Sequence, residues 1–189
     1  MEDVELNTTD LPHSAITSYS GYIYQGKIAV LHCLRLIEQL GQDTRVMLLQ
    51  IESIDDFAIL NPDRTCRSLH QVKARKNRLF NDYIPDVNKQ IEKANLHEGA
   101  EAFFHISINL NDMPSGFDQD YAPIKFYPYF NTSDQETNYC SLGDVDRFIE
   151  HQLSKTFNSL EPVENYKRSN DYLERCRRCL EDIVLKHVI

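Results

Sequence analysis

Apolar residues near the start of the chain recur every three or four positions, which is the spacing of a helix with one buried face. This pattern predicts one long, largely buried helix from about Tyr19 to Leu40. Ser18 is a candidate N-terminal cap for the helix, and Gly41 is a candidate stop. The polar and acidic residues 1–12 that precede it predict a flexible tail.

Strand-like patterns follow the helix. A buried strand is predicted within Arg45–Glu52, which contains the short apolar run VMLLQI. A second strand is predicted over Asp56–Leu60. The residues Asn61-Pro62-Asp63 are typical of a turn. A third strand with alternating character is predicted over Arg67–Ala74, and a fourth over Ala102–Leu110.

Helical patterns return on either side of the fourth strand. Pro85 suits the first turn of a helix that reaches about Leu96. The stretch 111–140 is rich in Pro, Asn, Asp and aromatic residues, and it predicts long loops around a short strand near Ile124–Tyr127. Its seven Tyr and Phe residues are compatible with base stacking, but packing of the loop region is the more frequent role of such residues.

The C-terminal part of the chain predicts two helices. Ser141 and Asp144 have the spacing of a capping box for a helix to about Phe157. Pro162 would then open a last helix, to about Lys186. The expected buried stripe of that helix is Tyr172, Cys176, Cys179, Leu180 and Ile183.

The order of these elements is helix, three strands, helix, strand, loops and two helices. That order predicts an α/β or α+β fold with a central mixed sheet flanked by helices. The chain has 189 residues, which suits one domain with a real core, so we expect residues 13–189 to form a single domain. Because the last predicted helix runs almost to Ile189, the chain is also compatible with being the N-terminal part of a longer protein.

Cysteine usage and hydropathy indicate a cellular compartment. The five cysteines are an odd number at irregular spacing, which favours free thiols in a reducing cytoplasm. Cys176 and Cys179 form a CxxC pair, but no second pair or His pair stands at the spacing of a structural zinc site. No apolar run is long enough to span a membrane, and the N-terminus lacks the pattern of a signal peptide. We therefore expect a cytoplasmic protein without a membrane partner.

The charge of the chain is unevenly distributed. The formal net charge is −9, which argues against a general polyanion binder. One segment is nevertheless strongly basic and contains no acidic residue. A solvated loop and a phosphate-binding segment both fit this pattern. The basic residues of the segment are Arg64, Arg67, Lys73, Arg75, Lys76 and Arg78.

The carboxylates of Asp55 and Asp56 lie where the first predicted strand ends and the second begins. Alternate side chains of a strand share a face, so Phe57 and Ile59 can point into the core while Asp56 and Ala58 point the other way. A carboxylate at the open end of a strand is a good ligand for Mg²⁺, which prefers oxygen donors. The competing interpretation is a polar turn, for which adjacent Asp55 and Asp56 are ordinary.

Two polar side chains share one face of the third predicted strand. Gln71 and Lys73 are two residues apart, while Val72 projects into the core and His70 lies on the opposite face. A lysine beside a metal-bound water can orient that water or stabilise negative charge on a phosphate. The amide oxygen of Gln71, or the carbonyl after it, can bind the metal. A half-exposed strand with a polar face would give the same short pattern.

The order and spacing of the three segments carry more information than any one of them. Gln25 on the first helix precedes Glu52 and Asp56, and Gln71 and Lys73 follow on the next strand, in the runs GYIYQ, LQIESIDDF and HQVKA. This arrangement resembles the PD-(D/E)xK nuclease superfamily, over roughly residues 18–110. It is most similar to the branch that has Gln in place of the acidic residue before Lys. That branch includes Mrr-like restriction enzymes and nuclease domains of bacterial antiphage effectors.

The resemblance implies a role for each residue. Asp56 would be the main metal ligand, Gln71 would replace the second acidic ligand, and Lys73 would be the catalytic lysine. Glu52 would be a further ligand or a base that orients water, and Gln25 would support the site from the first helix. The cofactor would be Mg²⁺ or Mn²⁺. Two departures leave alternatives open, since position 71 is not acidic and Asp55 competes with Asp56 as the ligand.

The implied activity is that of a metal-dependent endodeoxyribonuclease, the effector domain of a bacterial antiphage system. We expect oligomerisation, or a partner such as an SMC-like ATPase, to activate it, because uncontrolled cutting would kill the host. One alternative is a non-catalytic DNA-binding or assembly module with the same fold. Another is an unrelated α/β interaction protein. Residues expected to hold the backbone of double-stranded DNA are Arg64, Arg67, Arg75, Lys76 and Arg78.

Overall fold

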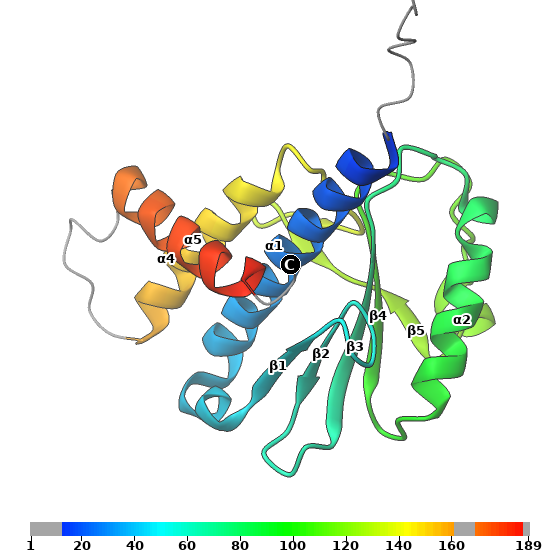
Figure 1. Cartoon of the computed structure of the whole chain (residues 1–189), viewed down its shortest axis with the longest axis horizontal. Coiled ribbons are helices and arrows are strands. Elements are labelled where there is room, and N and C mark those ends of the chain that lie inside the picture. The colour runs from blue at the N-terminus through cyan, green and yellow to red at the C-terminus, as the bar shows by residue number, and fades with distance from the viewer. Residues whose placement is uncertain (1–12, 161–168, 187–189) are drawn as a thin grey trace, which may run out of the picture.

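The computed structural model describes residues 13–160 and 169–186, and it has a five-stranded mixed sheet at its centre (Figure 1). The strands lie in the order β1-β2-β3-β4-β5, antiparallel from β1 to β3 and parallel from β3 to β5. This architecture confirms the expected α+β fold class. The bounds of the strands are β1 Leu48–Ile51, β2 Phe57–Leu60, β3 Cys66–Lys73, β4 Glu101–Ile106 and β5 Ile124–Phe126.

Helices cover both faces of the sheet (Figure 1). On one face, α1 (His13–Leu40) packs against the strands and carries α4 (Val145–Leu160) and α5 (Asn170–Leu185). On the other face lies α2 (Ile84–Asn95), with Pro85 in its first turn as expected. The described helices include none that is long and apolar enough to cross a membrane.

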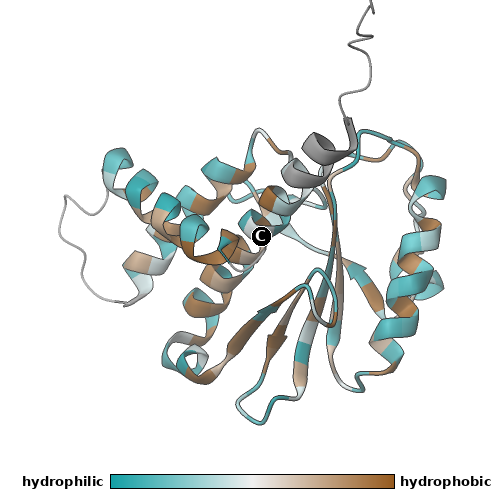
Figure 2. Cartoon of the chain, viewed as in Figure 1, coloured by the Kyte–Doolittle hydropathy of each residue, from teal (hydrophilic) through white to brown (hydrophobic). Residues whose placement is uncertain are grey.

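Each face of the sheet therefore has its own hydrophobic core. Phe57 and Val72 belong to the core under α1, whereas Ala58, Leu69 and Phe104 belong to the core under α2. Because successive residues of a strand point to opposite faces, burial on both sides makes β2 apolar at every position. Figure 2 shows this pattern as strands coloured mainly brown, with the teal surface of α2 turned outward.

Several predicted boundaries were wrong, and each error has a local cause. The first helix begins at His13, so Ser18 lies within it and does not cap it. The first strand begins at Leu48 because Gly41–Val46 forms a 3₁₀ helix, η1. The fourth strand ends at Ile106, where its parallel pairing with β3 ends. The predicted tail, residues 1–12, lies outside the described residues.

The region 111–140 has more structure than the predicted loops around one strand. It contains the short helix α3 (Phe117–Asp120) and a small hairpin of β6 (Tyr129–Phe130) and β7 (Glu136–Thr137). Packing is the observed role of several of the aromatic residues in 111–140, since Phe117 and Tyr129 are buried. Before this region, the 3₁₀ helix η2 (Phe80–Asp82) precedes α2.

The last helix does not run unbroken from Pro162. Ser169 is extended and its side chain accepts a hydrogen bond from the Tyr172 N–H, so it caps a helix that begins at Asn170. The start predicted at Pro162 lies outside the described residues. The predicted stripe was also wrong in part, because Cys179 is exposed and Ile183 is 59 % exposed. The buried positions of α5 are Leu173, Arg177, Glu181 and Val184.

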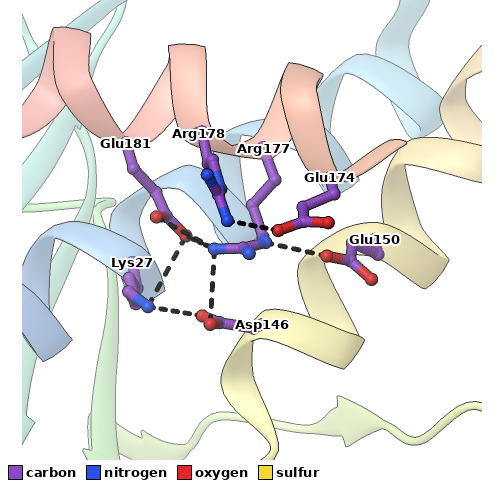
Figure 3. A network of polar contacts seen from close by, with 7 residues as sticks. All are labelled: Lys27, Asp146, Glu150, Glu174, Arg177, Arg178 and Glu181. Carbon is purple, nitrogen blue, oxygen red and sulfur yellow. Dashed lines mark hydrogen bonds and ion pairs between the residues drawn. The ribbon is translucent and has the colours of Figure 1, made fainter. Parts of the chain in front are cut away.

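The buried side chain of Arg177 explains why the buried positions of α5 differ from the predicted stripe (Figure 3). The Arg177 guanidinium lies 2.9 Å from Glu181 on its own helix and 2.9 Å from Glu150 on α4, and 3.3 Å from Asp146. Lys27 of α1 contacts Asp146 and lies 3.7 Å from Glu181. Arg177 and Glu181 thus take two of the buried positions of α5, where a hydropathy pattern predicts apolar residues, and they join α5 to α1 and α4.

Candidate active site

Asp56 lies at the point where the β1–β2 loop enters β2. Phe57 is opposite His70 in the antiparallel pair, so Asp56, one residue earlier, comes level with Gln71, one residue later. The Asp56 carboxylate accepts a hydrogen bond from the Val72 N–H at 2.6 Å and another from the Gln71 side-chain amide. The register of two neighbouring strands therefore brings together two residues that are 15 positions apart.

Gln25 connects the same loop to α1. This glutamine is 6 % exposed, and its Nε2 donates to the Glu52 carboxylate at 2.7 Å and to the Asp56 main-chain carbonyl at 2.6 Å. Glu52 has a φ of 55°, in the left-handed region that non-glycine residues rarely adopt. Its N–H donates to the Asp56 carbonyl at 3.1 Å. A strained residue held by a buried amide is typical of functional sites.

The electrostatic surroundings of Asp56 disfavour its charged form. Burial raises the pKa of the Asp56 carboxyl from its ordinary value of 3.8 to about 6. The hydrogen bond from Val72 opposes this effect, as does the positive charge of Lys73, while the neighbouring carboxylates of Asp55 and Glu52 add to it. A bound cation would favour the charged form of Asp56 and so offset the cost of burying this carboxylate.

Lys73 ends β3 on the same face as Gln71, but α2 supplies its nearest ionic partner. The Lys73 Nζ lies 3.0 Å from one Asp86 oxygen, and Arg75 lies 2.6 Å from the other. Asp86 was not among the predicted site residues. Its sequence signal was weak, because an acidic residue directly after Pro85 in the first turn of a helix is ordinary.

The structure separates Asp55 from Asp56. The Asp55 side chain is fully buried, accepts a hydrogen bond from Lys93 at 2.7 Å and lies 3.3 Å from the Gln90 amide, both on α2. Asp56, and not Asp55, is the carboxylate in contact with Gln71. This placement settles which of the two adjacent side chains lies beside the QxK pair of β3.

The basic segment is divided between the two ends of the sheet. Arg75, Lys76 and Arg78 are exposed on the loop that follows Lys73. Arg64 lies in the β2–β3 hairpin and Arg67 at the start of β3, at the opposite end of the sheet from Lys73 (Figure 1). Lys73 lies six positions beyond Arg67 along β3, which is about 20 Å at the rise of an extended chain. Only part of the predicted DNA-binding set therefore accompanies the candidate site.

The side chains at the site offer oxygen atoms, which are the ligands that a hard cation prefers. Asp56 and Glu52 offer carboxylate oxygens, and Gln71 can offer its amide oxygen after rotation of the amide group. Within the described ranges 13–160 and 169–186, no three side chains of His, Cys, Asp or Glu cluster in a way that could hold a metal ion. A cation with only two carboxylate ligands would keep several water ligands, which is common for Mg²⁺.

His70 lies on the face opposite Gln71, as predicted. Its ring stacks on Phe57 at a centroid distance of 4.2 Å and contacts His105 through a 2.9 Å hydrogen bond. Burial is the largest cause that lowers the pKa of His70 well below its ordinary value, so this ring is a neutral part of the core. The five cysteines are free thiols.

Comparisons of the chain with protein-family models, with curated proteins and with solved structures give no match. The candidate site is therefore defined by the geometry of its own residues.

Proposed function

We propose that this protein is a metal-dependent DNA endonuclease of the PD-(D/E)xK type. The observation that carries the proposal is the contact between Asp56 at the start of β2 and Gln71 on β3, with Lys73 two residues further along the same face. The raised pKa of Asp56 supports it, because a bound cation would offset the cost of holding a charged carboxylate in a buried position.

Each residue then has a chemical role in hydrolysis of a phosphodiester bond. Asp56, Glu52 and Gln71 would hold Mg²⁺ or Mn²⁺, which when bound polarises the scissile phosphate and lowers the pKa of water. Lys73 stabilises the negative charge that develops on the phosphate. Gln25 fixes Glu52 in its left-handed conformation, through the 2.7 Å hydrogen bond.

DNA binding is assigned to the exposed loop after β3. Arg75, Lys76 and Arg78 can contact backbone phosphates without reading sequence. Because the rest of the chain is acidic, we place the double-stranded DNA along this loop and not over the whole face of the molecule.

The cellular role rests on the resemblance of the three sequence segments. We assign the domain to a bacterial cytoplasm, as the effector of an antiphage system in which oligomerisation or a partner such as an SMC-like ATPase raises its activity. A cell that carries an unregulated nuclease would cut its own DNA, so the active state must depend on a second event.

One observation favours a second candidate function, a non-catalytic DNA-binding or assembly module. Lys73 is paired with Asp86, and position 71 carries an amide in place of a carboxylate. Either feature would lower catalytic competence without changing the fold. Metal binding distinguishes the two functions, because only a catalytic site requires the cation.

Cleavage of supercoiled plasmid tests the proposal. The chain is incubated with Mg²⁺ or Mn²⁺, and with EDTA as the control, over a range of protein concentrations. We expect metal-dependent nicking or linearisation that rises more steeply than in proportion to protein concentration. Full activity in a monomer with Mg²⁺ alone would contradict the proposed regulation, and absence of both cleavage and metal binding would contradict the enzyme itself.

A further inference from the structure

A second polar hollow lies at the hairpin end of the sheet, between α1 and the beginnings of β3 and β4. Its volume is about 200 Å³. The side chains that define its chemistry are His32, Arg35, Arg67, Ser68, Phe103 and Tyr127. About 20 Å of β3 separates Arg67 from Lys73, so this hollow is distinct from the candidate active site.

His32 is the buried polar group of the hollow. The residue is 6 % exposed, and its Nδ1 makes a 2.9 Å hydrogen bond with the Tyr127 hydroxyl. Its Nε2 is buried and has no hydrogen-bond partner among the described residues. Because a buried polar atom without a partner costs about 1–3 kcal/mol, most such atoms in folded proteins are paired. This nitrogen is itself closed off from solvent, so His32 forms part of the wall of the hollow and its ring serves as a reporter of changes there.

Two arginines give the hollow a positive character. The Arg35 guanidinium is held in place by the Pro128 carbonyl and by the rings of Tyr127 and Phe130, at 5.1 and 4.8 Å from the ring centroids. Arg67 forms no ion pair with any residue in the described part of the chain. Glu101 also lines the hollow, where its single carboxylate is outnumbered by the two guanidinium groups.

The protonation state of His32 follows from the same surroundings. Burial, together with the positive charges of Arg35 and Arg67, lowers the pKa of His32 to about 3. The imidazole is therefore neutral near pH 7. When Tyr127 donates its hydroxyl proton to Nδ1, the ring proton resides on Nε2.

We propose that this hollow binds a small oxyanion, a phosphate or carboxylate group, through Arg35 and Arg67, beside the neutral ring of His32. Guanidinium groups bind both kinds of oxyanion with paired hydrogen bonds. The volume of about 200 Å³ accommodates a small anion. The walls formed by Phe103 and Tyr127 suit a short apolar portion of such a molecule.

The test is an NMR titration of the full chain with ¹⁵N-labelled histidine at pH 7.5 and constant ionic strength. Inorganic phosphate and acetate are the two probes, since they separate phosphate recognition from carboxylate recognition. We expect one probe at least to shift the His32 ring nitrogen signals in a saturable way. In Arg67→Ala the affinity should fall about ten- to a hundredfold, as expected for loss of a charge-assisted hydrogen bond.

Arg64→Ala is the matched control, because Arg64 is an exposed arginine near the same hairpin that does not line the hollow. This variant should bind the anion as the unaltered chain does. A linear response without saturation, or equal affinities in the unaltered chain and Arg67→Ala, would overturn the proposal. So would a His32 response to a short DNA duplex with none to either small anion, since it would assign Arg67 to the DNA backbone.

Discussion

Asp55 and Asp56 are adjacent in sequence, yet their carboxylates contact different parts of the molecule. Asp55 is paired with Lys93 of α2 at 2.7 Å, while Asp56 accepts a hydrogen bond from the Val72 N–H of β3 at 2.6 Å. Asp55 is neutralised by a cation within the chain, whereas the Asp56 carboxylate is held beside Glu52 by hydrogen bonds from Gln71 and Val72. Structural and functional roles are thus divided between two neighbouring residues of the same type.

Removal of the Asp56 charge should stabilise the protein at neutral pH. Folding raises the pKa of Asp56 to about 6, so the folded state holds a proton more tightly than the unfolded state. The stability gained from protonation is fully present below pH 3.8 and is lost as pH rises through about 6. Asp56→Asn should therefore raise the free energy of unfolding by on the order of 2 kcal/mol at pH 7.5 without metal, with the gain vanishing near pH 4. Thermal melts from pH 4 to 8 measure it.

Asp55→Asn should have the opposite effect at pH 7.5. Loss of the buried charge leaves Lys93 without its partner, and we expect a loss of about 1–3 kcal/mol, reduced because Lys93 is partly exposed. Equal effects of the two substitutions in the same melts would contradict the division of roles between these residues.

Divalent metal should stabilise the chain in a pH-dependent way. Protonation of Asp56 competes with metal binding, so Mg²⁺ or Mn²⁺ should raise the Tm more at pH 8 than at pH 5. At a tenfold excess over Kd the gain is about 1.4 kcal/mol, or roughly 3–6 °C. Differential scanning fluorimetry measures the shift. Asp56→Asn is the control, and a shift that survives in this variant would place the metal elsewhere.

Gln25 should act on the site through Glu52. Gln25→Leu removes both hydrogen bonds to the β1–β2 loop, and we expect Mn²⁺ affinity and DNA cleavage to fall about 10- to 100-fold. Gln39→Leu, on the same helix at an exposed position, is the matched control. Equal Mn²⁺ affinities in the two variants, measured by titration calorimetry, would show that Gln25 has no positioning role.

DNA affinity should depend on one end of the sheet only. Lys76→Ala and Arg78→Ala should each weaken binding to DNA of any sequence and reduce the slope of log K against log salt concentration by about 1. Arg64→Ala changes an exposed arginine at the opposite end and should leave both quantities unchanged. Fluorescence anisotropy at several salt concentrations measures them. Loss of affinity in Arg64→Ala alone would reverse the proposed orientation of the DNA.

The ion-pair network of α5 should be essential to the fold. Arg177→Ala leaves the buried Glu181 with Lys27, at 3.7 Å, as its remaining cation and should cost about 3 kcal/mol, the lower end of the range for a broken buried pair. Arg178→Ala removes an exposed partner of Glu174 and should cost less than about 1 kcal/mol. Urea denaturation of both variants gives the comparison. Similar free energies of unfolding for the two variants would mean that the buried ion pairs of Arg177 stabilise the fold no more than the exposed pair of Arg178 does.

The spacing of apolar residues predicted the helices and strands that surround the site, because each of these elements has a continuous apolar face. It placed Asp56, Gln71 and Lys73 correctly relative to the core, since strand alternation alone puts them opposite Phe57, His70 and Val72. It could not decide between Asp55 and Asp56, because that choice depends on Lys93, 38 residues further along the chain.

The failures have a common physical origin in contacts between distant segments. Arg177 can take a buried position on α5 because it meets acidic residues of α4, which no local pattern shows. Asp86 is a partner of Lys73 because α2 packs on the sheet, and the local sequence does not show this contact. The division of the basic segment was also invisible in sequence, because a strand of eight residues carries its two ends far apart.

The most direct test of the central claim is cleavage of supercoiled plasmid DNA by three variants with Mn²⁺ present. Asp56→Asn and Lys73→Ala each change a proposed catalytic residue, and Asp63→Asn changes an exposed carboxylate in the distant β2–β3 hairpin. The account predicts that the first two variants lose cleavage by at least about a hundredfold while remaining folded, and that Asp63→Asn cuts as the unaltered chain does. Cleavage retained by folded Asp56→Asn and Lys73→Ala would contradict the assignment of the active site.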